Sequence, residues 1–110
     1  MEAIVFDDFG ECEVTTVPDP EINEDEVLIK VSRVQLSVTE CAIYQGNASA
    51  YFETIQRRLN DGPAQLFGHE FSGRVVEAGN EVTDLSVGDR VYPPGKISCH
   101  DCQYCQQGYT

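Results

Sequence analysis

The segment at residues 27–34 reads VLIKVSRV and is the clearest strand signal in the chain. Successive side chains of a strand point to opposite faces, so Val27, Ile29 and Val31 share one face while the residues between them share the other. We therefore expect a sheet to be built around this segment.

Shorter signals predict four further strands, at residues 3–6, 11–17, 71–78 and 90–92. Turn residues at 7–10 separate the first two and predict a hairpin. Two short helices are expected at residues 38–45 and 51–60. Ser49 or Asn47 is the candidate cap of the second helix. Short strands punctuated by glycine and proline predict a mainly β, barrel-like domain with one or two short helices.

Composition and charge narrow the classes of function. The chain has 110 residues, of which 41% are hydrophobic and 24% charged, as expected of one packed globular domain. Nineteen acidic against seven basic residues give a formal net charge of −12, which should repel nucleic acid and anionic membranes. This acidic surface is either an ordinary solvated face or an adaptation to high salt. Neither a membrane-spanning apolar run nor a secretory signal is visible, so the expected location is cytoplasmic.

Five cysteines in a chain expected in the cytoplasm indicate metal or redox chemistry before disulfides. Three of them, Cys99, Cys102 and Cys105, recur at every third residue. Thiolates at this spacing can converge on one zinc ion, with Zn–S distances of about 2.3 Å. Three thiolates are one short of a closed structural site. The candidates for the fourth ligand are Cys12, Cys41, His100, another chain and sequence beyond Thr110.

A second candidate site lies at Gly68-His69-Glu70, between a loop and a predicted strand. A neutral imidazole beside a carboxylate can bind zinc directly, or the carboxylate can support a zinc-bound imidazole through a hydrogen bond. The alternative is that His69 is an ordinary surface or core histidine. Phe67 and Phe71 flank the pair and can provide an apolar wall.

The chain carries five motifs in an order that resembles the N-terminal GroES-like domain of the zinc-dependent medium-chain alcohol dehydrogenase family. They are EVLIKV at 26–31, SVTE within 37–46, GHExxG at 68–73 continuing to the glycine at 79, VGDRV at 87–91 and CxxCxxC at 99–105. The resemblance covers essentially the whole chain and depends on the order of the motifs more than on any single one. It implies a GroES-like, partly open β-barrel with one or two short helices.

The resemblance further implies that residues 1–110 are the zinc- and substrate-binding domain of a dehydrogenase, truncated on its C-terminal side. In that family a Rossmann domain that binds NAD or NADP follows, and this chain carries no G-x-G-x-x-G motif after a strand. A fourth cysteine three positions past Thr110 would complete the cysteine site. The implied partners are a small alcohol or carbonyl substrate and the missing Rossmann domain, with a homo-oligomer left open. The isolated chain is expected to oxidise no alcohol.

Residue roles also come from the resemblance. His69 would bind the catalytic zinc, with Glu70 as a second ligand or close partner. Thr39 matches the hydroxyl that hands the alcohol proton into a relay, and Glu40 occupies the place of an aspartate that supports His69. Zinc would act as a Lewis acid that stabilises the alkoxide before hydride transfer.

The sequence departs from the family at the first catalytic ligand, which is a cysteine there and Ser37 here. A neutral hydroxyl is a far weaker zinc ligand than a thiolate. Cys41, about one helical turn further on, either substitutes for it or is a small buried hydrophobic residue. Ala42 stands where many members carry a relay histidine, and the segment at 47–64 is longer than usual and can reshape the substrate mouth.

Three functions therefore stay open. The first is the zinc and substrate half of an NAD(P)-dependent alcohol or polyol dehydrogenase. The second is a non-catalytic zinc-binding module with the same barrel. The third is a metal-free member similar to the quinone reductases of the wider family, which would use only the hydroxyl relay.

Overall fold

The computed structural model describes residues 1–47, 51–95 and 97–109. Its elements are, in chain order, β1 (Glu2–Asp8), β2 (Glu11–Thr16), β3 (Val27–Gln35), α1 (Val38–Tyr44), α2 (Phe52–Asn60), β4 (Glu70–Ala78), β5 (Arg90–Val91) and α3 (Gln103–Gln106). All five predicted strands and both predicted helices are present, with their ends shifted by a few residues at most. The candidate cap Ser49 lies outside the described residues. The other candidate, Asn47, is not the cap, because the N-cap position of α2 is Tyr51, whose side chain makes no capping hydrogen bond.

The first sheet is the hairpin of β1 and β2, which pair antiparallel. Gly10 lies in the turn with a φ of 73°, a left-handed conformation that glycine adopts without steric cost. Phe6 of β1 is fully buried and exchanges two backbone hydrogen bonds with Ala64, at 2.8 and 2.9 Å. This bridge ties the hairpin to the chain segment that leads into β4.

The second sheet has the order β3-β4-β5, with antiparallel neighbours. The segment at 27–34 therefore builds the sheet that its alternation predicts. Gly73 of β4 faces β3 so closely that a Cβ there would lie 2.6 Å from Cγ2 of Ile29 and would also overlap the carbonyl of Lys30. Only glycine fits at this close approach of the two paired strands.

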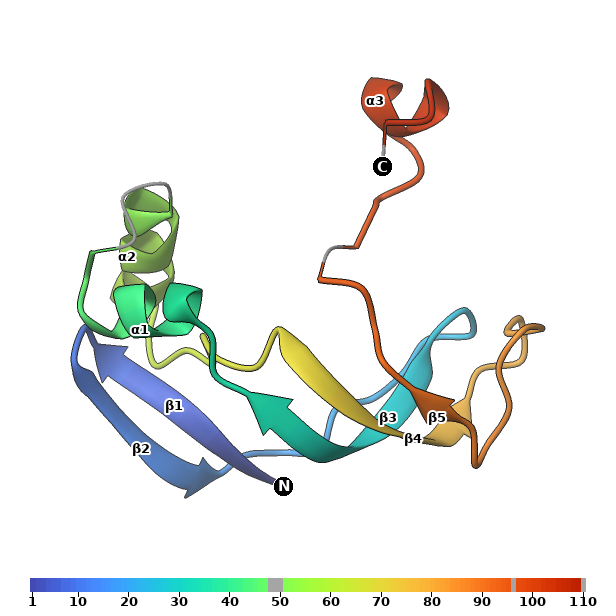
Figure 1. Cartoon of the computed structure of the whole chain (residues 1–110), viewed down its shortest axis with the longest axis horizontal. Helices are drawn as coiled ribbons and strands as arrows, with labels where there is room; N and C mark the ends of the chain where they lie inside the picture. Colours follow the sequence, from blue (N-terminus) through green and yellow to red (C-terminus); the bar gives the residue numbers. More distant parts are fainter. Residues whose placement is uncertain (48–50, 96, 110) are drawn as a thin grey trace.

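The two helices between β3 and β4 cover one end of the hairpin (Figure 1). Ile43 of α1 and Ile55 of α2 are buried against each other, and Phe9 of the hairpin turn stacks on Phe52 with ring centroids 5.1 Å apart. Burial of such side chains is the main force that fixes α1 in place. The start of α1 is thereby held beside the loop that precedes β4.

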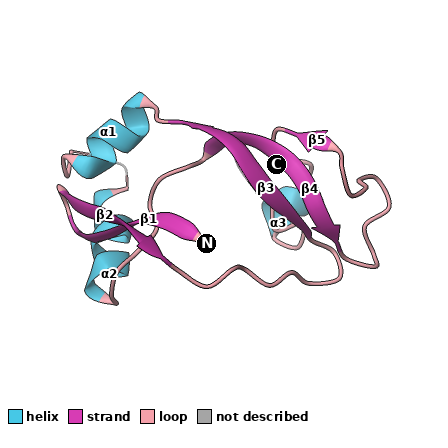
Figure 2. Ribbon diagram, turned by 90° about the horizontal axis from the view of Figure 1, so that it is seen from below, coloured by secondary structure: helices cyan, strands magenta, loops and turns pink. Residues whose placement is uncertain are grey.

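Figure 2 shows the hairpin with α1 and α2 at one end of the molecule and the β3-β4-β5 sheet at the other. The described residues form two small sheets and no closed barrel, and a groove of about 670 Å³ lies between β1 and β3, lined largely by apolar side chains. The prediction of a mainly β, open architecture is confirmed. The one-turn helix α3 was not predicted, and it lies in the cysteine-rich tail that extends away from the sheets. None of the helices in the described part of the chain is long and apolar enough to cross a membrane.

Candidate active site and metal centre

Glu40 is the centre of the first candidate site. It lies in the first turn of α1, three residues after the N-cap residue Ser37, where a negative charge is favoured by the helix dipole. Its side chain is 1% exposed, and it is the only charged residue that is buried among the described residues. A buried carboxylate is costly unless hydrogen-bond donors surround it, so its partners decide whether the site is stable.

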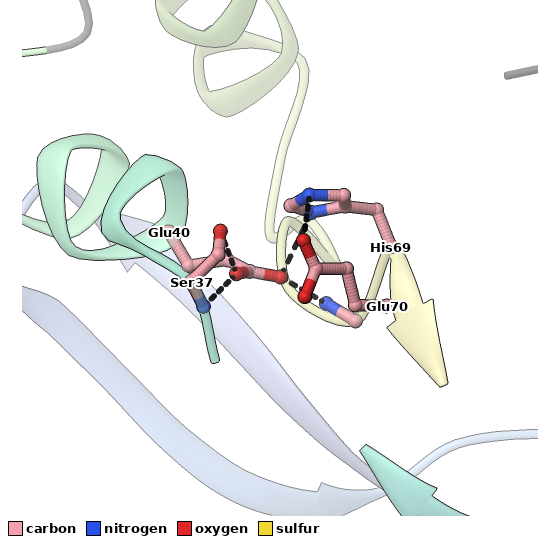
Figure 3. Close-up of polar contacts among 5 residues, drawn as sticks. Ser37, Glu40, His69 and Glu70 are labelled. Carbon is pink, nitrogen blue, oxygen red and sulfur yellow. Dashed lines mark hydrogen bonds and ion pairs between the residues drawn. The ribbon is translucent and has the colours of Figure 1, made fainter. Parts of the chain in front are cut away.

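Four donors converge on this carboxylate (Figure 3). The backbone N–H and the hydroxyl of Ser37 both donate to Oε2, the hydroxyl at 2.7 Å. The backbone N–H of Gly68 donates to Oε1 at 3.0 Å, and Nδ1 of His69 lies 2.9 Å from the same oxygen. Glu40 therefore joins the start of α1 to the loop before β4, across 28 positions of sequence.

These contacts set the charge of Glu40. Burial alone would raise the pKa of its carboxyl group, but the hydrogen bonds from Ser37 and Gly68 and the nearby His69 outweigh that effect and lower the pKa to about 2. Glu40 is consequently a carboxylate at every pH near neutrality and acts there only as an acceptor.

His69 and Glu70 lie where the chain enters β4. Because a carboxylate only accepts hydrogen bonds, the contact with Glu40 assigns a proton to Nδ1 of His69. The lone pair of neutral His69 is then on Nε2, which lies 3.7 Å from Oε1 of Glu70. The two side chains are 43% and 37% exposed, so this face of the site is open to a ligand. A carboxylate that fixes the tautomer of an imidazole is the usual partner of a metal-binding histidine.

The other residues predicted for this site, Ser37, Thr39 and Cys41, differ in how far their side chains are exposed. Ser37 is half-buried and turned toward Glu40, whereas Thr39 is exposed on the first turn of α1. Cys41 is also exposed, so its interpretation as a small buried hydrophobic residue is wrong. The neighbouring core position of α1 is filled instead by Ile43, which leaves Cys41 on the outer face.

The second candidate site is the cysteine tail. The sulfur atoms of Cys99, Cys102 and Cys105 lie within 4.8 Å of one another, and those of Cys99 and Cys105 are 3.9 Å apart. Sulfurs bound tetrahedrally to one zinc would be separated by about 3.8 Å, given Zn–S bonds of about 2.3 Å. No other group of three potential ligands meets this distance criterion in the part of the chain that the structure describes, so Cys12, Cys41 and His100 stand apart from it.

One thiol of the tail has a lowered pKa. The backbone N–H groups of Asp101 and Cys102, followed by the thiols of Cys102 and Cys105, lower the pKa of Cys99 to about 7. Since a thiolate rather than a thiol binds metal, the donor set of the tail fits zinc. At the other site His69 and Glu70 also fit as donors, but the hydroxyl of Ser37 is already directed at Glu40.

Sequence reasoning missed one member of the first site, the backbone N–H of Gly68. The only sign of it in the sequence is the glycine itself, which in the structure has a φ of 105°, a conformation that only glycine adopts readily. This conformation directs the peptide N–H toward Glu40 one residue before His69. The glycine of the GHE motif is therefore part of the site and not merely a flexible neighbour.

Comparison with known proteins adds family and fold. The family model of the alcohol dehydrogenase GroES-like domain matches residues 23–110. An L-threonine 3-dehydrogenase of Bacillus velezensis is 39% identical over an alignment of 110 positions, which covers 98% of this chain and 29% of that protein. The chain thus spans less than a third of that relative's length.

Solved structures agree on the fold. An alcohol dehydrogenase from Thermus sp. ATN1 has a TM-score of 0.77 and 26% identity, over 99% of this chain and 29% of its own. A putative zinc-binding dehydrogenase of Sinorhizobium meliloti, solved bound to NADP, has a TM-score of 0.73 and 32% identity. The match covers 97% of this chain and 28% of that protein. A quinone oxidoreductase of Coxiella burnetii has a TM-score of 0.70 and 32% identity. The match covers 84% of this chain and 28% of that protein.

Proposed function

This chain belongs to the alcohol dehydrogenase GroES-like domain family, and we propose that it is the zinc- and substrate-binding part of a zinc-dependent alcohol or polyol dehydrogenase. In this proposal residues 1–110 form the catalytic domain, and NAD or NADP binds a Rossmann domain elsewhere in the protein. The short share of the relative's length that the chain covers supports such a division. The observation that carries the proposal is the hydrogen bond between Glu40 and Nδ1 of His69, which leaves Nε2 for a metal.

Each residue has a definite task in this proposal. Nε2 of His69 and the carboxylate of Glu70 would hold the catalytic zinc, while the three cysteines of the tail would hold a structural one. A zinc ion bound there would act as a Lewis acid toward the oxygen of the alcohol. The carbon that carries this oxygen would give its hydride to the nicotinamide. The exposed hydroxyl of Thr39 accepts the alcohol proton and passes it toward solvent. Glu40 keeps the imidazole in its tautomer.

The full-length protein provides the test. We expect it to reduce NAD or NADP in the presence of a small alcohol, as followed by nicotinamide absorbance, and we expect His69→Gln to abolish this activity. Glu53→Gln is the control, because Glu53 is exposed on α2 and belongs to neither donor set. Residues 1–110 alone should show no turnover, and turnover by that piece would contradict the proposal.

A metal-free reductase is the second candidate function, and the contacts of Ser37 favour it. The family's thiolate ligand is absent here, and the hydroxyl in its place donates to Glu40. Similarity to a quinone oxidoreductase gives this candidate a structural precedent. An active full-length protein that keeps its activity with no zinc beyond the cysteine site would favour this function over the first. Cytoplasmic location and a homo-oligomeric state stay predictions.

A further inference from the structure

The two oxygens of Glu40 receive donors from opposite sides of the site. Oε2 accepts both donors of Ser37, and Oε1 accepts the N–H of Gly68 and Nδ1 of His69. A carboxylate has about four lone-pair positions, so four donors fill it. Because the carboxylate is rigid and planar, fixing Oε2 also fixes the direction in which Oε1 faces His69.

The hydroxyl of Ser37 is committed to this contact. It lies 2.7 Å from Oε2, and since the carboxylate can only accept, the hydroxyl must donate its proton. A serine alkoxide would place a second negative charge beside Glu40, which like-charge repulsion disfavours. Ser37 therefore stays a neutral hydroxyl, which is a poor zinc ligand.

We propose, on the premise of the proposed function, that Ser37 is a positioning residue and not a metal ligand. Its two hydrogen bonds orient Glu40, and Glu40 in turn holds the proton of His69 on Nδ1 and leaves Nε2 free for the metal. The serine thus replaces the family's thiolate in the sequence without replacing it as a ligand.

The chain offers a matched control in Ser86. The backbone N–H of Ser86 donates to Oδ2 of Asp89 at 2.9 Å, with the same spacing of three residues that separates Ser37 from Glu40. This second pair is exposed and lies in the turn before β5, without contact to His69. Ser86→Ala removes a hydroxyl from a similar local motif but leaves Glu40 untouched.

The experiment uses the full-length protein with ¹⁵N-labelled histidine, in wild type and in the variants Ser37→Ala, Ser37→Thr, Ser86→Ala, Glu40→Gln and Ser37→Ala combined with Glu40→Gln. The first readout is the tautomer of His69 in zinc-free protein, from the ¹⁵N shifts of signals that His69→Gln removes. The second readout is the affinity of the zinc ion that His69→Gln removes, measured by competition with a chelator.

We expect the Nδ1–H tautomer in wild type and a mixture of both tautomers in Ser37→Ala. Zinc affinity should fall about tenfold in Ser37→Ala, the low end of effects for groups that support a ligand. Ser37→Thr, which keeps the hydroxyl, should restore both properties, and Ser86→Ala should change neither. In the Glu40→Gln background the added Ser37→Ala change should have no further effect, because positioning acts only through Glu40.

Three results would overturn the proposal. One is an unchanged His69 tautomer in Ser37→Ala. The second is an affinity loss that is just as large in the Glu40→Gln background, which would make Ser37 a direct ligand. The third is a failure of Ser37→Thr to restore the wild-type tautomer. If the protein binds no zinc through His69, the proposed function fails, while the tautomer of zinc-free protein still decides the positioning role of Ser37.

Discussion

The two candidate metal sites differ in how the chain builds them. The three thiols of the tail come from residues 99–105, and their convergence needs only one tight bend, with His100 at a φ of 57°, and the single turn of α3. The Glu40 site joins the start of α1 to the loop before β4 and needs both sheets in place. The tail is exposed, whereas Glu40 is buried. The first site is therefore local and separable, while the second is part of the fold.

The largest expected effect is the loss of metal from the tail. Cys105→Ser should remove about one zinc per chain, because two thiolates and a hydroxyl bind zinc far more weakly than three thiolates. If the tail is separable, the unfolding transition of the remainder should not move. Zinc release to a colorimetric chelator and thermal unfolding measure the two properties. Cys12→Ser, which changes an exposed cysteine of β2, is the control and should lose no zinc.

The next effect concerns the fold-dependent site. Glu40→Ala should lower the free energy of unfolding by about 3–5 kcal/mol, since it leaves the donors around a buried carboxylate without an acceptor. Glu70→Ala, at a side chain that is 37% exposed, should change it by only about 0.5 kcal/mol. Urea unfolding curves measure both. Equal losses of unfolding free energy in the two variants would contradict the difference expected between a buried and an exposed carboxylate.

Acid should weaken the same site more mildly, because protonation leaves the side chain in place. The pKa of Glu40 in the folded state is about 2, below the ordinary value of 4.5, so the unfolded chain binds more protons between these values. The contribution of Glu40 to stability is therefore complete above about pH 4.5 and is lost as the pH falls toward 2. Glu40→Gln should show a flatter profile over this window. Parallel profiles for the two proteins would contradict the lowered pKa.

The smallest expected effect is a shift in thiol reactivity. In zinc-free protein the alkylation rate of Cys99 should rise with a midpoint near pH 7, because the N–H groups of Asp101 and Cys102 stabilise its thiolate. Mass spectrometry of iodoacetamide-treated protein, digested at several pH values of labelling, follows this rate. Added zinc should protect Cys99 but not Cys12. A midpoint near the ordinary pKa of 9 would contradict the lowered pKa of Cys99.

The same contrast explains what could be predicted from the sequence. The spacing of the cysteines was sufficient to predict their convergence, because local chain geometry alone closes that cluster. The alternation at 27–34 and the turn residues at 7–10 likewise report local conformation, and the strands and hairpin they predicted are present.

The Glu40 site could not be derived in this way. Nothing in local spacing brings residue 40 to residue 69, and only the family resemblance suggested that Glu40 supports His69. The N–H of Gly68 was missed as a donor, and Ser37 was considered only at the ligand position, because the direction in which each group points is set by the folded structure. The exposure of Cys41 was also mispredicted, since it depends on which face of α1 packs on α2.

In the proposed function His69 holds zinc at a site without thiolate ligands, supported by Ser37 through Glu40. X-ray absorption at the zinc edge of the full-length Cys105→Ser variant tests it most directly, because that variant retains only the second site. We expect a first shell of nitrogen and oxygen with imidazole scattering and no sulfur near the usual ~2.3 Å. A shell that contains sulfur, or a variant that holds no zinc at all, would contradict it.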